Sequence, residues 1–247
     1  MKLTVLGCSG SLPGPDSPAS GYLVDADGFR LVLDLGSGAM GTLQRHVPPD
    51  EDDAIVLSHL HPDHCVDLAA YHVALRYGPH RPATRIPVIA PAGTQERIES
   101  IIDPTSGVRH LQELFEFSTP ASGEIGPFAL SFAPVNHPVP TYAVRVTDGE
   151  RTLVYSGDTG ESEALTALAH GADVMLCEAT FSPKDPYTPN LHLTGRQAGE
   201  HATRANVDRL ILTHIPPWGS RATAVAEAST AFAGSVEAAQ PGGQYWI

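Results

Sequence analysis

Three histidines and one aspartate fall within six positions, at His59, His61, Asp63 and His64. Imidazole and carboxylate groups together suit zinc and other divalent ions of intermediate softness. His59 and His61 are two residues apart, so on an extended backbone their side chains point the same way. Pro62 then turns the chain and lets Asp63 and His64 face a second point nearby. The spacing therefore predicts ligands for two neighbouring metal ions.

The segment before this cluster explains how it is positioned. Residues 54–57 read Ala-Ile-Val-Leu, which predicts a short buried strand. Loops at strand ends are where α/β folds place their chemistry. The alternative is a solvated loop with chance histidines. Four ligand-type residues directly after a hydrophobic strand disfavour that alternative.

The composition fits one large globular domain. Of the 247 residues, 42% are hydrophobic and 17% are charged, which is enough to bury a substantial core. No run approaches the roughly 18 apolar residues of a membrane helix, so no membrane association is expected. The net charge of −13 argues against a broad basic surface for long nucleic acid. A small phosphorylated substrate is compatible with that charge, because bound metal would reverse the local field.

Three cysteines, Cys8, Cys65 and Cys177, are scattered without a Cys-x-x-Cys pair. An odd, unpaired number indicates a reducing compartment. Residues 5–8 superficially resemble a lipoprotein cleavage box, but only seven residues precede Cys8, too few for a signal peptide. We therefore expect a cytoplasmic protein. Cys65 follows His64 directly and either lies near the metals or packs as a small buried residue pointing away.

The rest of the chain alternates predicted strands and helices. Asp27-Gly28 predicts a tight hairpin turn between strands over 21–26 and 30–35. Other strands are expected at 2–6, 86–90, 128–134, 141–147, 151–155, 173–177, 209–212 and 244–247, and helices at 40–46, 66–77, 93–102, 162–170, 195–205 and 222–233. Residues 103–120 are not assigned, and His72 and His80 are expected on the surface. The glycine-rich loop over 7–11 either binds phosphate through backbone N–H groups or forms a plain turn.

The motif His59-x-His61-x-Asp63-His64 resembles that of the metallo-β-lactamase superfamily. The resemblance implies an α/β fold, a four-layer αβ/βα sandwich with its metal centre at the sheet edges, in one hydrolase domain over residues 1–247. It also implies three more ligands downstream, and the chain supplies a candidate after each of three predicted strands: His137, Asp158 and His214. Asp34, in an Asp-x-Gly segment, would orient a ligand histidine from behind.

The implied centre holds two divalent ions. Zinc is expected from the histidines, and manganese is the alternative. One ion would be bound by His59, His61 and His137, and the other by Asp63, His64 and His214. Asp158 would bridge them, because a carboxylate has two oxygens. Such a pair of ions lowers the pKa of water to about 7 and takes up charge on a phosphoryl oxygen, which suits hydrolysis.

Within the superfamily, two segments look like the ribonuclease Z branch: Glu-Ala-Thr-Phe from Glu178 and His-Leu-Thr from His192. Carried over, His192 would be the general acid, held by Glu178, and Asp63 completes the candidate catalytic set. A phosphodiester needs such an acid because its alkoxide leaves poorly. A lone exposed histidine is the alternative for His192. The chain departs from the branch at Cys177, where histidine is usual, and at Leu193, where serine is usual.

The segment between the third histidine and the bridging aspartate is short. Members of the branch that cut transfer RNA carry a long arm there. In this chain His137 and Asp158 are 158 − 137 = 21 positions apart, and one predicted hairpin fills the interval. At a net charge of −13, a chain without this arm is a poor candidate for holding transfer RNA.

Five stretches look like the actinobacterial atypical cyclic-nucleotide phosphodiesterases of this fold: 7–11, 14–22, 58–61, 155–160 and 212–218. This resemblance implies hydrolysis of 3′,5′-cyclic AMP to AMP, a small-molecule partner and, at family level, a homodimer. Trp218 would either stack on the adenine or pack in the core. The competing interpretations are a transfer-RNA 3′-endonuclease, a lactonase- or β-lactamase-type hydrolase, and a non-catalytic metal-binding protein.

Overall fold

Two mixed β-sheets form the centre of the computed structural model, which describes residues 1–79, 81–105, 111–184, 188 and 190–247. Among these residues, the first sheet has the order β14-β1-β2-β3-β4-β5-β6, with bounds Gln244–Trp246, Lys2–Gly7, Gly21–Ala26, Phe29–Leu35, Ala54–Val56, Ile86–Ile89 and Phe115–Ser118. The second has the order β13-β12-β11-β10-β9-β8-β7, with bounds Ser235–Ala238, Arg209–Thr213, Val174–Glu178, Thr152–Tyr155, Tyr142–Thr147, Phe128–Pro134 and Gly123–Ile125.

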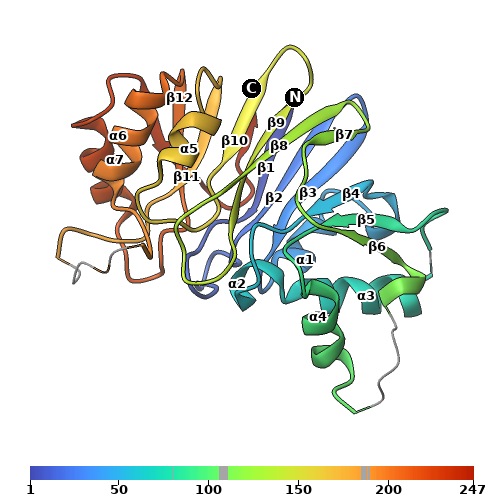
Figure 1. The fold of residues 1–247 in the computed structure, drawn as a ribbon. Coiled ribbons are helices and arrows are strands. Elements are labelled where there is room, and N and C mark those ends of the chain that lie inside the picture. The colour runs from blue at the N-terminus through green and yellow to red at the C-terminus, as the bar shows by residue number, and fades with distance from the viewer. Residues whose placement is uncertain (80, 106–110, 185–187, 189) are drawn as a thin grey trace.

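Helices cover the outer face of each sheet (Figure 1). On the first sheet these are α1 (Ala39–Leu43), α2 (Pro62–Cys65), α3 (Asp67–Tyr77) and α4 (Thr94–Ile102), with short 3-10 turns η1 (Pro49–Glu51) and η2 (Leu111–Glu113). On the second sheet they are α5 (Glu163–Leu168), α6 (Gly195–Ala205) and α7 (Arg221–Ser229). The order helices, sheet, sheet, helices confirms the predicted αβ/βα sandwich.

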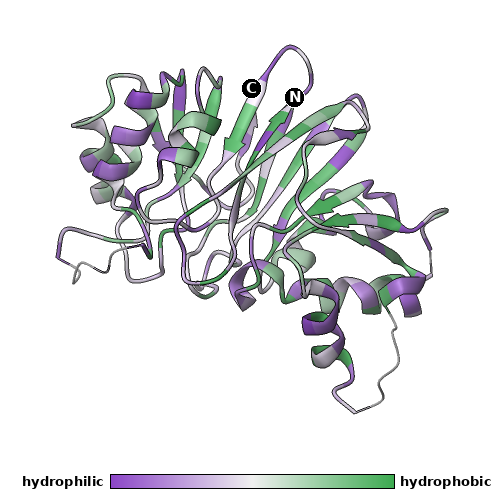
Figure 2. Ribbon diagram, viewed as in Figure 1, coloured by the Kyte–Doolittle hydropathy of each residue, from purple (hydrophilic) through white to green (hydrophobic). Residues whose placement is uncertain are grey.

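Alternate side chains of the strands pack into different apolar layers. Leu31 and Leu33 of β3 point into the core between the sheets, whereas Val32 points to the helix layer behind. Leu153 and Val154 of β10 divide in the same way between the central core and the layer under α5, α6 and α7. Because successive side chains of a strand face opposite ways, a strand covered on both sides must be apolar throughout. Figure 2 shows hydrophobic residues along the strands and hydrophilic ones on the outer helices.

The strand directions bring the carboxyl ends of several strands to one edge of the sheet. Strands β3 to β6 are parallel to one another, and so are β10 to β13. Strand β8 runs antiparallel to β9, which runs antiparallel to β10, so β8 shares the direction of β10. The carboxyl ends of parallel strands meet at the same edge of a sheet. The segments after β8, β10, β11 and β12 therefore leave the second sheet together.

Most predicted elements are present, with shifted bounds. The hairpin β2–β3 is confirmed, and Asp27 and Gly28 both have positive φ, 52° and 79°, as its tight turn requires. Strands β7 and β13 were not predicted. Each is short and mostly exposed or half-buried at a sheet edge, so its hydrophobic pattern is weak. The unassigned stretch 103–120 contains η2 and β6, with 106–110 outside the described residues.

The expected surface position of His72 is wrong. Its residue is only 2% exposed, because it lies on the same face of α3 as Leu68, which packs against the sheet. His80, also expected on the surface, lies outside the described residues. Cys65 is fully buried in the helix layer behind the first sheet, away from the core between the sheets, which settles it as a small packing residue. No helix among the described residues is long and apolar enough to cross a bilayer.

Candidate metal centre

The sheet edge gathers the predicted ligands from both halves of the chain. The first four follow β4, and Pro62 begins the short helix α2, which carries Asp63 and His64. Proline suits the first position of a helix, where its missing N–H costs nothing. The other three come from the second sheet, after β8, β10 and β12: His137, Asp158 and His214. All seven predicted ligands meet in two overlapping groups.

The first group contains His59, His61, His137 and Asp158, whose ligand-type atoms all lie within 4.8 Å of one another. His61 Nδ1 is 3.1 Å from His59 Nε2 and 3.1 Å from His137 Nε2. Asp158 Oδ2 lies 3.6 Å from His59 Nε2. Three imidazole nitrogens and a carboxylate oxygen therefore converge on one point, as the first predicted ion requires.

The second group contains Asp63, His64, His214 and again Asp158. His214 Nε2 is 3.0 Å from His64 Nε2 and 3.1 Å from Asp63 Oδ2. The other oxygen of Asp158, Oδ1, lies 3.2 Å from His64 Nε2 and 3.4 Å from His214 Nε2. One carboxylate thus turns one oxygen to each group, which is the geometry of a bridging ligand.

Each of four imidazoles is held from behind through Nδ1. His64 Nδ1 donates to Asp34 Oδ2 at 2.7 Å, and His137 Nδ1 donates to the Leu191 carbonyl at 2.9 Å. His59 Nδ1 lies 3.0 Å from Ser58 Oγ, and His214 Nδ1 lies 2.8 Å from Thr180 Oγ1. Both hydroxyls donate elsewhere, to Asp34 and to the His214 carbonyl, so they accept from the imidazoles. A neutral ring that donates through Nδ1 presents an unprotonated Nε2 to a metal.

Asp34 is the centre of the support behind the site. Its fully buried carboxylate accepts from the Ser58 N–H at 2.6 Å, from Tyr155 Oη at 2.7 Å and from His64 Nδ1. The predicted contact between Asp34 and a ligand histidine is therefore present. Asp34 and His214 both have left-handed backbones, with φ of 60° and 55°. Such conformations cost non-glycine residues about 1 kcal/mol or more and gather at functional sites.

Sequence reasoning missed the roles of Ser58, Thr180 and Tyr155. Thr180 and His214 are 34 positions apart, and Tyr155 and Asp34 are 121 apart. No local spacing signals contacts between residues so distant in the chain. The hydroxyl of a serine or threonine next to a motif is the only cue available.

The charges at the site fit divalent cations. Burial alone would raise the pKa of Asp158, but the imidazoles of His214, His64 and His59 outweigh it and hold that pKa well below its usual range. Burial lowers the pKa of His59 well below its usual value, with the neighbouring His64 adding to the effect, so His59 is neutral and able to bind metal.

The clearest sign of a missing positive charge is at Asp158 Oδ1. It is buried without a hydrogen-bond partner among the described residues. The Nε2 atoms of His64 and His214 lie only 3.0 Å apart, and each ring has its Nδ1 on a supporting oxygen. A cation between them would satisfy both the carboxylate oxygen and the facing nitrogens. The side chains present therefore fit two divalent ions.

Glu178 and His192 form a separate pair at the margin of the second group. Glu178 is fully buried, and its carboxylate accepts from three backbone N–H groups, those of Thr159, Thr180 and Leu193. It also accepts from His192 Nδ1 at 2.9 Å. Burial would lower the pKa of His192, but the Glu178 carboxylate outweighs it and raises the pKa to about 9.

The His192 side chain is only 11% exposed, and its ring packs on two of the candidate ligands. The ring centroids are 5.4 Å from that of His137 and 5.5 Å from that of His214. The alternative of a lone exposed histidine does not fit this position. Because Nδ1 is bound to Glu178, Nε2 is the nitrogen left to exchange a proton.

Two further predicted features are now placed. The loop after β1 packs against the His214 loop, where the Gly10 N–H donates to the Ile215 carbonyl at 3.2 Å and the Ser11 N–H faces His214 Nε2 at 3.4 Å. Trp218 is 70% exposed, so the interpretation as a core residue is wrong. It lies in a turn closed by the Gly219 N–H and the Pro216 carbonyl, which holds the indole at the surface.

Known proteins are similar to this chain in sequence and fold. Residues 29–215 match the family described as a beta-lactamase superfamily domain. An uncharacterised protein of Mycobacterium leprae is 46% identical over 248 residues, covering 98% of this chain and 87% of that protein. A ribonuclease Z of Mycobacterium bovis is 29% identical over 274 residues, covering 96% of this chain and 95% of that protein.

The chain therefore belongs to the metallo-β-lactamase superfamily as a metallo-hydrolase, and its similarity to a ribonuclease Z is consistent with the ribonuclease Z-like branch. The probable metallo-hydrolase YhfI of Bacillus subtilis is 32% identical over 251 residues, covering 98% of each protein. The crystal structure of YhfI superimposes with a TM-score of 0.87 at 30% identity, covering 99% of this chain and 98% of that chain.

Proposed function

We propose that this metallo-hydrolase is a phosphodiesterase that uses two divalent ions, zinc or manganese, to hydrolyse small phosphodiesters, with 3′,5′-cyclic AMP converted to AMP as its main reaction. The observation that carries the proposal is the buried Glu178–His192 pair beside two ligand groups that share Asp158. Substrates with good leaving groups do not need a dedicated acid, whereas an alkoxide does.

The residues take distinct roles in this proposal. One ion would be held by His59, His61 and His137, the other by Asp63, His64 and His214, with Asp158 between them. Ions bound there supply Lewis acidity to a phosphoryl oxygen and lower the pKa of water to about 7. Asp63, 12% exposed at its side chain, is the ligand nearest solvent in its group and so the one most able to face incoming water.

The acid step uses only groups of the chain. Water attacks phosphorus, the bond from phosphorus to O3′ breaks, and the water oxygen stays on phosphorus. His192 gives its Nε2 proton to the departing O3′, and Glu178 stabilises the imidazole through Nδ1. The proton that water releases returns His192 to its protonated form, so the products are AMP and unchanged enzyme.

A small substrate is favoured over transfer RNA. Between His137 and Asp158, all of which is described, the chain forms the hairpin β9–β10 and short connections on either side of it. No arm projects from that interval. The net charge of −13 opposes binding of a long polyanion, whereas one or two phosphates need only the local field of the ions.

Transfer-RNA 3′-processing is the second candidate, because the named ribonuclease Z relative covers 96% of this chain. A lactonase or β-lactamase activity is less well supported. A lactone or lactam needs less help with its leaving group, which would leave the Glu178–His192 pair without a purpose.

A paired turnover assay tests the proposal. Metal-loaded protein is incubated with 3′,5′-cyclic AMP, with AMP followed by chromatography, and separately with a precursor transfer RNA. We expect AMP release and intact RNA. Cleaved RNA with untouched cyclic AMP would instead assign the chain to transfer-RNA processing.

A further inference from the structure

Two neighbouring cavities of about 330 Å³ each lie near the candidate acid, and His192 lines one of them. One has His192 and Ser11 in its wall, and the other extends to Lys184 and to α7. Four residues line both cavities, so the two lie side by side: Thr180, Phe181, Pro216 and Trp218. A volume of this size is in the range that holds a small organic ligand.

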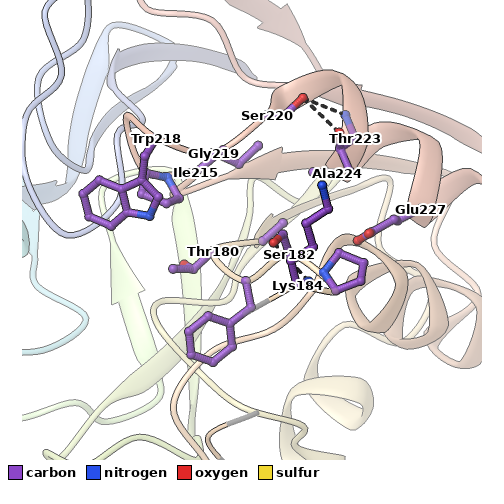
Figure 3. Close-up of a pocket in the computed structure, with 14 residues that line it drawn as sticks. Thr180, Ser182, Lys184, Ile215, Trp218, Gly219, Ser220, Thr223, Ala224 and Glu227 are labelled. Carbon is purple, nitrogen blue, oxygen red and sulfur yellow. Dashed lines mark hydrogen bonds between the residues drawn. The ribbon is translucent and has the colours of Figure 1, made fainter. Parts of the chain in front are cut away.

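Aromatic rings line the space next to the acid. The Phe181 ring meets the His192 imidazole edge to face, with centroids 5.3 Å apart and an interplanar angle of 89°. The Phe181 N–H donates to the Leu193 carbonyl at 2.9 Å, which fixes this wall to the segment that carries His192. Trp218 comes from the turn after β12 and lies on one side of the cavity, with Lys184 and Glu227 on the other (Figure 3).

The exposure of Trp218 to water is energetically unfavourable. At 70% exposure it leaves a large apolar surface in water, although the turn that carries it is fixed by a hydrogen bond. An indole held rigidly beside a cavity is suited to stack on a flat partner. The rim is polar: it includes Lys184, whose backbone N–H donates to Ser182 Oγ at 3.4 Å, and Thr223 on α7. An aliphatic group would not use these polar groups, whereas a polar heteroaromatic ring would.

We propose that these joined cavities are the subsite for the heteroaromatic base of the substrate, with Trp218 as its stacking residue and Phe181 as the wall that sets the base next to His192. The proposal rests on the proposed function, because it takes the ester group at the metal centre to be part of a nucleotide. Every base can stack on an aromatic ring, so Trp218 provides affinity for a base in general. The polar rim around Lys184 then selects among bases.

Fluorescence tests binding without catalysis. The chain has two tryptophans, and Trp246, on β14, lines neither cavity. In a Trp246→Phe variant all indole emission comes from Trp218. We expect AMP to quench or shift this emission, and ribose 5-phosphate, which has the phosphate but no base, to leave it unchanged. An equal response to both compounds, or no response to saturating AMP, would overturn the subsite.

Kinetics tests the contribution to catalysis. Trp218→Ala should raise KM for 3′,5′-cyclic AMP about tenfold or more, and Trp218→Phe should recover most of the loss. The KM for the base-free 1-O-methyl ribofuranose 3′,5′-cyclic phosphate should not change. Trp246→Ala, which removes the other exposed tryptophan, should match the unmodified enzyme on both substrates. Equal KM changes on both substrates in Trp218→Ala would contradict the proposal.

The two proposals fail separately. If 3′,5′-cyclic AMP is not cleaved but AMP alone perturbs Trp218, the subsite stands and the assigned reaction is wrong. If 3′,5′-cyclic AMP is cleaved and Trp218→Ala leaves its KM unchanged, the reaction stands and the subsite is wrong.

Discussion

Asp158 is the residue on which both ligand groups depend, since each of its oxygens faces a different group. We expect Asp158→Ala to lose bound metal and to lower kcat at least about a hundredfold, because the ions lose their shared ligand and the imidazoles their charge partner. Metal content by atomic emission and turnover on bis(p-nitrophenyl) phosphate measure this. Asp208→Ala, an exposed residue just before β12 at the opposite edge of the same sheet, is the control. Full metal content in Asp158→Ala would rule out the bridging role.

His192 should separate acid catalysis from metal binding, because it contacts Glu178 and packs on ligands without belonging to either principal group. His192→Ala should keep both metals and lose about a hundredfold or more in kcat on 3′,5′-cyclic AMP. On bis(p-nitrophenyl) phosphate, whose nitrophenolate leaves unaided, the loss should be much smaller. His170→Ala, on an exposed residue after α5, controls for loss of an imidazole. Equal losses on the two substrates would remove His192 from the acid role.

At the scale of elements, the loop after β1 and the loop after β12 fit against each other closely. A Cβ placed on Gly10 would lie 2.3 Å from the carbonyl oxygen of His214. We therefore expect Gly10→Ala to displace the His214 loop, weaken metal binding and destabilise the fold by about 2 kcal/mol.

Gly41→Ala is the matched control, because a Cβ there meets nothing within 4 Å and the residue lies inside α1. It should be neutral or stabilise by up to about 1 kcal/mol. Urea unfolding with metal analysis compares the two. Similar metal affinity in both variants would show that the close contact at Gly10 does not position His214.

Asp52 and Tyr71 join the segment before β4 to helix α3. Tyr71 Oη lies 2.6 Å from Asp52 Oδ2, and burial raises the pKa of Asp52 to about 7 despite this hydrogen bond. A carboxyl with a raised pKa in the folded state favours folding most when protonated. Its contribution is complete below the unfolded pKa of about 4 and is lost as the pH rises towards 7.

The unfolding free energy should show this dependence. Between pH 5 and pH 8 the unmodified protein should lose about 2 kcal/mol relative to Asp52→Asn, which keeps the shape but does not titrate. Urea denaturation of both proteins at the two pH values measures the difference. Parallel pH profiles would mean that Asp52 titrates alike in the folded and unfolded chain.

For the whole molecule, bound ions would tie the two sheets together, because the candidate ligands come from segments after β4 on one side and after β8, β10 and β12 on the other. Ions that bind only the folded chain stabilise it, by about 2.7 kcal/mol at a hundredfold excess over Kd. Chelation should therefore lower Tm by several degrees, and added zinc or manganese should restore it. Calorimetry of the unmodified protein and Asp158→Ala compares them. A chelator effect of equal size in both would place the stabilising ions elsewhere.

The individual strands and the first ligand cluster could be predicted from the sequence for a local physical reason, whereas the sandwich fold and the downstream ligands came from the resemblance to the superfamily. An apolar strand segment followed directly by His, Asp or Glu marks a strand end that carries a candidate site residue. The hairpin at Asp27-Gly28 follows from turn chemistry alone. His72 and strands β7 and β13 were not readable, because an edge strand is partly polar and a buried polar residue looks like a surface one.

The sequence by itself therefore indicated which residues are candidate metal ligands, and the superfamily to which the chain belongs. Only the tertiary structure decided how they act together. It placed Thr180 behind His214 and Tyr155 against Asp34, selected His64 as the ring that Asp34 holds, and left Trp218 at the surface beside a cavity. These contacts join residues that are tens to more than a hundred positions apart, and such distances are set by sheet order and strand direction, which local spacing does not encode.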